Sequence, residues 1–262
     1  MAAKAARGLL DWLFPPRTVN TNKDTGLLKL IAMICMLVDH LGAVVFPQYR
    51  AMRIIGRIAF PLYAYCLAVG CAFTKNMLRY VVRVALLMLV SQPIYVVVMN
   101  HTNSAMYSVS FAEHPVRAAF TFYLESFRDP SILLSLLVGM ILIWSIRDRQ
   151  FVITACVGVF LYYAHGILDY GWRGIVLMLL FYLLASRPIL SMPIVTAFMV
   201  WWGLSGAGYS VMGVRFGIQM FAIFALPFVY IPTKTNLRLP KWVFYLFYPA
   251  HLLLVWGMKL LV

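Results

Sequence analysis

Long apolar runs separated by short polar stretches follow one another along most of the chain. The first run, residues 27–46, is long enough to cross a bilayer, because about 20 apolar residues in a helix span roughly 30 Å of hydrocarbon. The runs do not alternate between apolar and polar positions, which favours helices over barrel strands. Nine such segments are expected: 27–46, 58–74, 80–99, 131–146, 151–168, 174–186, 188–203, 216–232 and 242–261. The pattern therefore predicts an all-α polytopic membrane protein, a bundle of about nine transmembrane helices.

Basic residues gather in every second connection between these segments. They are Lys4, Arg7, Arg17, Lys23, Lys29, Lys75, Arg79, Arg83, Arg147, Arg149, Arg187, Lys234, Arg238 and Lys241. Because cytoplasmic connections carry an excess of lysine and arginine, this alternation predicts a cytoplasmic N-terminus.

Two stretches lie outside the regular succession of segments. Residues 1–26 carry the apolar patch LLDWLF, which is too short for the core of a signal peptide, and we expect a cytoplasmic amphipathic segment lying on the membrane. Residues 27–262 then form a single transmembrane domain with an outer loop at 100–130. A loop of this length is often a lid or a dock for an acceptor, although an addition without such a role fits equally well.

The composition excludes a soluble domain and limits the kinds of partner that are expected. Hydrophobic residues make up 63% and charged residues 11% of the chain, with a mean hydropathy of +0.87, whereas soluble domains are about 25% charged. The net charge of +14 lies between apolar segments, where anionic lipid headgroups favour it, so we expect membrane lipids and no nucleic acid as partners. The four cysteines fall inside apolar runs and predict core residues, with neither disulfides nor a metal site.

Asp39 and His40 interrupt the first apolar segment. A charge in such a position costs at least ~2.5 kcal/mol, so intramembrane ionisable residues are candidates for function. His40 lies roughly 20 Å from the cytoplasmic end of the helix, and its imidazole is suited to act as a general base. Adjacent helical residues point about 100° apart, so Asp39 is expected to pair with an arginine or cap a helix rather than orient His40.

Other polar residues allow more than one interpretation. Arg53 and Arg57 share a helix face on the predicted outer side, either as a pair reaching the headgroups or as partners of Asp39 or of an anion. His251 lies halfway along the last segment, where it could share a layer with His40. A hydrogen bond between helices suffices to explain Gln219. The chain has no glycine-rich phosphate loop before a helix, no HExxH, no CxxC and no GxSxG.

Six blocks in a fixed order carry a family resemblance. They are LKLIAMICMLVDHLG, RIIGRIAFPLYAYCLAVG, YVVRVALLMLVSQPIY, LDYGWRGIVLMLLFY, IQMFAIFALP and KWVFYLFYPAHLLLV. Together they resemble the TraX family. This resemblance implies a multi-pass protein of the bacterial cytoplasmic (inner) membrane that acts in conjugative-pilus assembly and acetylates the pilin N-terminus. It also implies a relation to transmembrane acyltransferases that use cytoplasmic acetyl-CoA.

The resemblance also suggests site residues. Those that match the family's motifs are Asp39, His40, Arg53, Gly56, Arg57, Pro61, Asp169, Tyr170, Gly171, Gln219, Tyr248, Pro249 and His251. We expect His40, Asp39 and His251 to be catalytic. Substrate binding is expected of Arg53, Arg57, Asp169, Tyr170, Gln219 and Tyr248.

The expected reaction is transfer of an acyl group from acetyl-CoA to an amine or hydroxyl. The donor's phosphates would contact Arg79, Arg83 and Lys241, and the acceptor, a pilin or a glycan, would arrive from the outer side. The alternatives are a transporter for a small anion or a lipid-linked substrate, and a non-catalytic scaffold for pilus assembly. The N-terminal 26 residues and the loop at 100–130 are longer than the family pattern, which fits adaptation to a different acceptor.

Overall fold

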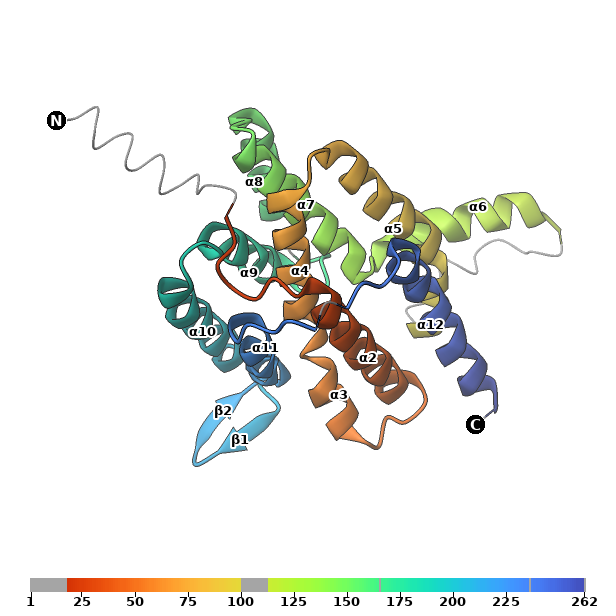
Figure 1. Ribbon diagram of the computed structural model, residues 1–262. Helices are drawn as coiled ribbons and strands as arrows, with labels where there is room; N and C mark the ends of the chain where they lie inside the picture. Colours follow the sequence, from red (N-terminus) through yellow and green to blue (C-terminus); the bar gives the residue numbers. More distant parts are fainter. Residues whose placement is uncertain (1–17, 100–112, 165, 236, 262) are drawn as a thin grey trace.

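The computed structural model describes residues 18–99, 113–164, 166–235 and 237–261, which form a bundle of helices with one small hairpin (Figure 1). The α-helices are α2 (Thr25–Val44), α3 (Arg50–Gly56), α4 (Ala59–Phe73), α5 (Met77–Met99), α6 (Pro115–Glu125), α7 (Ile132–Arg147), α8 (Phe151–Ala164), α9 (Gly171–Leu184), α10 (Pro188–Leu204), α11 (Leu226–Tyr230) and α12 (Lys241–Leu261). Short 3₁₀ helices, η2 (Ser126–Arg128) and η3 (Ile218–Ala225), precede α7 and α11, and β1 (Tyr209–Val211) pairs with β2 (Val214–Phe216). Each of the nine predicted apolar segments contains a helix.

The expected number of membrane crossings is not confirmed. Among the described residues, four helices are long and apolar enough to cross a bilayer: α2, the stretch Arg50–Phe73, α5 and α12. A fifth is obtained if Pro115–Arg128 and α7, which meet at 63°, count as one span. Helices α8, α9, α10 and the η3–α11 unit are apolar but only 10–17 residues long. The prediction of an all-α membrane protein is therefore confirmed, and the prediction of nine full crossings is not.

Close packing of α2, α4 and their neighbours forms the core of the bundle. Helix α2 contacts α3, α4 and α12, and α4 also contacts α7 and α9. A Cβ added at Gly42 would lie 2.6 Å from the Cβ of Met52, so the small residue on α2 lets α3 approach closely. Tyr65 of α4 and Phe181 of α9 meet edge to face, with ring centroids 5.5 Å apart.

A polar junction ties the chain before α2 to α11 and to the segment that follows it. The Asn22 side chain donates to the Phe228 carbonyl at 2.8 Å, and Asp24 accepts from the Thr235 backbone amide at 2.7 Å and from its hydroxyl at 2.6 Å. The Thr235 hydroxyl bond lowers the pKa of the Asp24 carboxyl below its usual value. Asp24 also caps α2 by accepting from the Leu27 amide. Residues 1–17 lie outside the described residues, so the expected amphipathic segment remains a prediction.

The described part of the expected outer loop is mostly helical and is tied to α5. Helix α6 is amphipathic, and its exposed Val116, Phe120 and Leu124 recur at every fourth position. The fully buried Gln92 amide of α5 donates to the carbonyls of Ser126 and Asp129 and accepts from the Ser131 amide. This amide anchors the turn between η2 and α7. Residues 100–112 lie outside the described residues.

Candidate active site

Asp39 and two arginines form a buried ion cluster between α2, α3 and α4. Arg57 Nη2 donates to both Asp39 carboxylate oxygens, at 2.7 and 2.8 Å. Arg53 Nη1 donates to Asp39 Oδ2 at 2.6 Å and to the Asp39 backbone carbonyl at 3.2 Å. The expected pairing of Asp39 with an arginine is thus confirmed, and it involves both candidates.

Gly56 makes this cluster possible. A Cβ at Gly56 would lie 2.0 Å from Asp39 Oδ1 and 2.3 Å from the Asp39 Cβ, so only glycine allows the C-terminal end of α3 to lie against the carboxylate. The close approach places Arg53 and Arg57 on either side of Gly56, with both guanidinium groups within reach of Asp39.

His40 and His251 come from helices at opposite ends of the chain and meet in the core. His40 Nδ1 lies 2.8 Å from His251 Nε2, and the two ring planes differ by 14°. His251 Nδ1 in turn lies 2.9 Å from the Phe247 carbonyl oxygen. Helix α12 continues through Pro249, although a proline inside a helix removes a backbone hydrogen bond. The predicted shared layer of the two histidines is confirmed.

His40 lines a cavity of about 590 Å³ that extends along the bundle. Helix α4 and its C-cap Thr74 line much of its length, because Phe60, Tyr63, Leu67 and Gly70 recur every three or four residues and so share one face of the helix. From Phe60 to Thr74 this face extends about 20 Å, at 1.5 Å per residue. The apolar pattern of α4 does not reveal this face, since lipid-facing and cavity-facing positions are both apolar.

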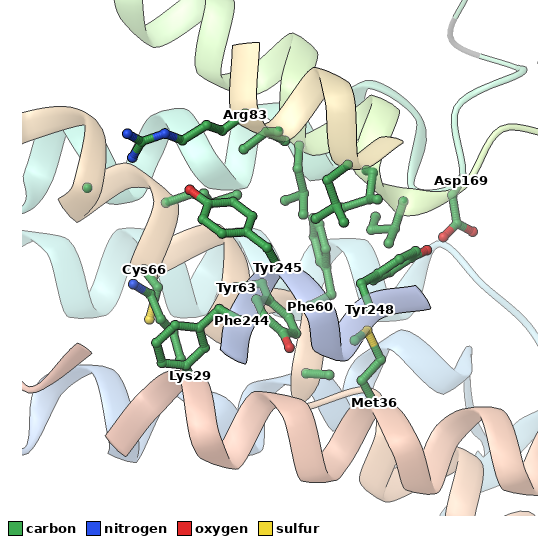
Figure 2. A pocket seen from close by; sticks show the side chains of 18 of the residues that line it. Lys29, Met36, Phe60, Tyr63, Cys66, Arg83, Asp169, Phe244, Tyr245 and Tyr248 are labelled. Atoms are coloured by element: carbon green, nitrogen blue, oxygen red, sulfur yellow. The ribbon is translucent and has the colours of Figure 1, made fainter. Parts of the chain in front are cut away.

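The two ends of this long cavity differ in chemistry. One end carries Lys29, Lys75, Arg79 and Arg83, and the other carries Asp169 beyond the Asp39 cluster. Figure 2 shows Lys29 and Arg83 at one side of the cavity and Asp169 with Tyr248 at the other. On α2, Lys29 and His40 lie 11 residues apart, which is about 16 Å along the helix. A long ligand with an anionic end can therefore contact the basic groups and reach His40.

The end of the cavity away from the lysines is rich in tyrosine. Arg57 Nη1 donates to the Tyr170 hydroxyl at 3.4 Å, and Tyr170 stacks on Phe60 with centroids 4.0 Å apart. Tyr95 and Tyr248 also line the cavity. The Tyr248 hydroxyl is buried at this end of the cavity and faces the Ser131 side chain. Sequence reasoning missed Tyr95, which lies in the block YVVRVALLMLVSQPIY.

Most of the predicted site residues line the cavity, and three of them are not among its described lining residues. Asp39, Arg53, Arg57, Asp169, Tyr170, Tyr248, Arg79 and Arg83 line the cavity with His40. His251 is absent from the described lining residues and reaches the site through His40. Gln219 lies on η3 and is not among the described lining residues either. Lys241 is the first residue of α12, and its side chain lies outside what the structure describes.

A known protein family matches nearly the whole of this chain. The sequence profile described as TraX protein matches residues 24–259, nearly the whole chain. The chain belongs to the TraX family. This membership supports a pilus-associated membrane protein, and the TraX family is linked to pilin acetylation.

A curated relative matches only a short part of this chain. The chain is 44% identical over 46 residues to the uncharacterized protein RP591 of Rickettsia prowazekii. That match covers 18% of this chain and 18% of the relative. No solved structure matches the chain significantly.

Proposed function

We propose that this member of the TraX family is an integral-membrane acyltransferase of the bacterial cytoplasmic membrane. It transfers an acetyl group from acetyl-CoA to an amine or hydroxyl of a pilin N-terminus or a surface glycan. The observation that carries this proposal is the long cavity, which joins a cluster of basic residues to a buried histidine. The family's link to pilin acetylation supports the same reaction.

The donor fits the cavity in size and charge. Ligand pockets typically enclose about 300–1,000 Å³, and this one encloses about 590 Å³. Acetyl-CoA carries phosphates at one end and a thioester at the end of a long flexible arm. Lys29, Lys75, Arg79 and Arg83 supply charged donors for the phosphates. The arm then passes along α4 toward His40, with the nucleotide entering from the cytoplasmic side.

His40 supplies the base. Its Nδ1 is occupied by His251, so Nε2 is the ring atom left for an acceptor. Nε2 takes the proton of the acceptor amine or hydroxyl as the acceptor atom bonds to the thioester carbon. The carbon–sulfur bond then breaks, and the CoA thiolate leaves with the proton from His40. Arg53, which lines the cavity beside His40, places positive charge where the tetrahedral oxyanion forms.

The acceptor occupies the other end of the cavity. Asp169, Tyr170, Tyr95 and Tyr248 line that end and provide one carboxylate and three hydroxyls. A protonated amine approaching from the outer side is attracted by Asp169 and releases one proton to the outer solvent, so that it reaches His40 as a neutral nucleophile with one further proton to give to Nε2.

The test is label transfer in proteoliposomes. Radiolabelled acetyl-CoA is supplied with a peptide that has a free N-terminal amine, beside the same peptide blocked at its N-terminus. Wild-type protein is expected to label the free peptide. His40→Ala is expected to reduce transfer by roughly 100-fold or more, the usual contribution of a general base, while acetyl-CoA binding is retained.

A matched variant controls for nonspecific effects. His114 stands before α6, is exposed, and does not line the long cavity, so His114→Ala is expected to transfer acetyl at the wild-type rate. Full activity of His40→Ala would rule out the proposed base. Passage of an anion or a lipid-linked substrate without acetyl transfer would favour a transporter, and neither activity would favour a pilus-assembly scaffold.

A further inference from the structure

The hydrogen bonds of His251 determine which of its ring nitrogens carries a proton. Its Nδ1 lies 2.9 Å from the Phe247 carbonyl oxygen, one helical turn earlier in α12. A carbonyl oxygen only accepts, so Nδ1 must be the donor. A neutral imidazole has a single N–H, and Nε2 of His251 therefore carries a lone pair.

The tautomer of His251 determines the tautomer of His40. Because His251 Nε2 accepts, His40 Nδ1 at 2.8 Å must donate to it. Neutral His40 then has its proton on Nδ1 and a lone pair on Nε2, the atom left for the acceptor. The chain from the Phe247 carbonyl through both rings has only this arrangement when both histidines are neutral.

The surroundings of His251 hold its ring in place. Its side chain is 3% exposed, and the Phe247 ring stacks on it at 4.8 Å with 7° between the planes. The Tyr248 ring meets it edge-on at 5.4 Å. The charged groups near His40 are Asp39, Arg53 and Arg57, and Asp39 is engaged by both arginines. The carboxylate next to His40 in the sequence therefore does not orient the imidazole.

We propose that His251 is the positioning residue that holds His40 in the tautomer with its lone pair on Nε2. His251 also stabilises the imidazolium that forms when His40 takes a proton, because Nδ1–H of His40 keeps donating to His251 Nε2. A carboxylate plays this part in Ser-His-Asp triads, and here an imidazole fixed by a backbone carbonyl does so. Only the kinetic consequence of this assignment rests on the proposed function.

Two substitutions of His251 separate its role in orienting His40 from its role in packing. His251→Gln retains an oxygen that can accept from His40 Nδ1–H, whereas His251→Phe keeps a ring of similar size without an acceptor. We expect His251→Phe to lower kcat by roughly 100-fold or more, in the range by which a misplaced general base slows a reaction. The KM for acetyl-CoA should stay unchanged, and His251→Gln should recover kcat to within about tenfold of wild type. Equal kcat values for the two variants would overturn the proposal.

A spectroscopic measurement tests the tautomer without relying on activity. The ¹⁵N signals of histidine-labelled protein in lipid bilayers report which ring nitrogen is protonated, and the His40 signals are those that disappear in His40→Ala. Wild-type His40 should show a protonated Nδ1 and a bare Nε2, and His251→Phe should lose this preference. A proton on Nε2 of neutral wild-type His40 would overturn the inference. Absence of acetyl transfer in wild-type protein would instead refute the proposed function and leave the tautomer result standing.

Discussion

Asp39 is shared by two guanidinium groups that differ in their access to solvent. The Arg57 side chain is 10% exposed and bonds to both carboxylate oxygens, whereas the Arg53 side chain is 32% exposed and bonds to one. Two positive charges around one negative charge leave the cluster with a net positive charge beside His40. The carboxylate therefore holds the arginines in place and is not free to take part in proton transfer.

Replacing this carboxylate is expected to destabilise the fold. Asp39→Asn leaves the buried Arg57 without a counter-charge, and removing one partner of a buried pair costs about 3–5 kcal/mol. Arg53→Gln breaks only the more exposed contact, and we expect a loss of about 1 kcal/mol or less. Thermal unfolding in detergent compares the two variants, and an equal decrease in Tm would contradict this ranking.

At the scale of elements, small residues decide how closely helices approach. Gly42 lets α3 lie on α2, and Gly56 lets the end of α3 contact Asp39. Gly174 of α9 does the same for the Phe60–Tyr170 stack, since a Cβ there would lie 2.7 Å from the Tyr170 Cβ. These glycines position the charged and aromatic walls of the cavity, although none of them carries a functional group.

Gly56→Ala tests this dependence. The new Cβ would overlap the Asp39 carboxylate, which must move away from Arg57. Overpacking of this kind usually costs about 1–3 kcal/mol, and we expect acetyl transfer to decrease with stability. Gly158 of α8 is a matched control, because a Cβ there meets nothing within 4 Å. Gly158→Ala should leave transfer unchanged and stabilise the helix by up to about 1 kcal/mol. Wild-type stability and activity of Gly56→Ala would refute the role of this glycine.

At the scale of the whole molecule, the sequence identifies polar residues within apolar runs better than it predicts how the helices pack. Asp39, His40, Arg53 and Arg57 stand out because an apolar run tolerates such residues only with partners. The contact between His40 and His251 bridges 211 positions and depends on how α2 and α12 pack. The number of crossings is not confirmed for a related reason: apolar composition marks α8 to α11 as buried or lipid-facing, but it does not determine how long each helix is.

The continuity of the cavity leads to a prediction about donor access. Leu67 lines the cavity on the face of α4 that joins the basic end to His40. Leu67→Trp should narrow this passage and raise the KM for acetyl-CoA by about tenfold or more, which corresponds to about 1.4 kcal/mol of lost binding. A short acetyl thioester without the nucleotide should still react, because His40 is unchanged. Leu246→Trp is the matched control, since Leu246 on α12 is 57% exposed and does not line the described cavity. If Leu67→Trp binds and uses acetyl-CoA as wild-type protein does, the donor does not reach His40 along α4.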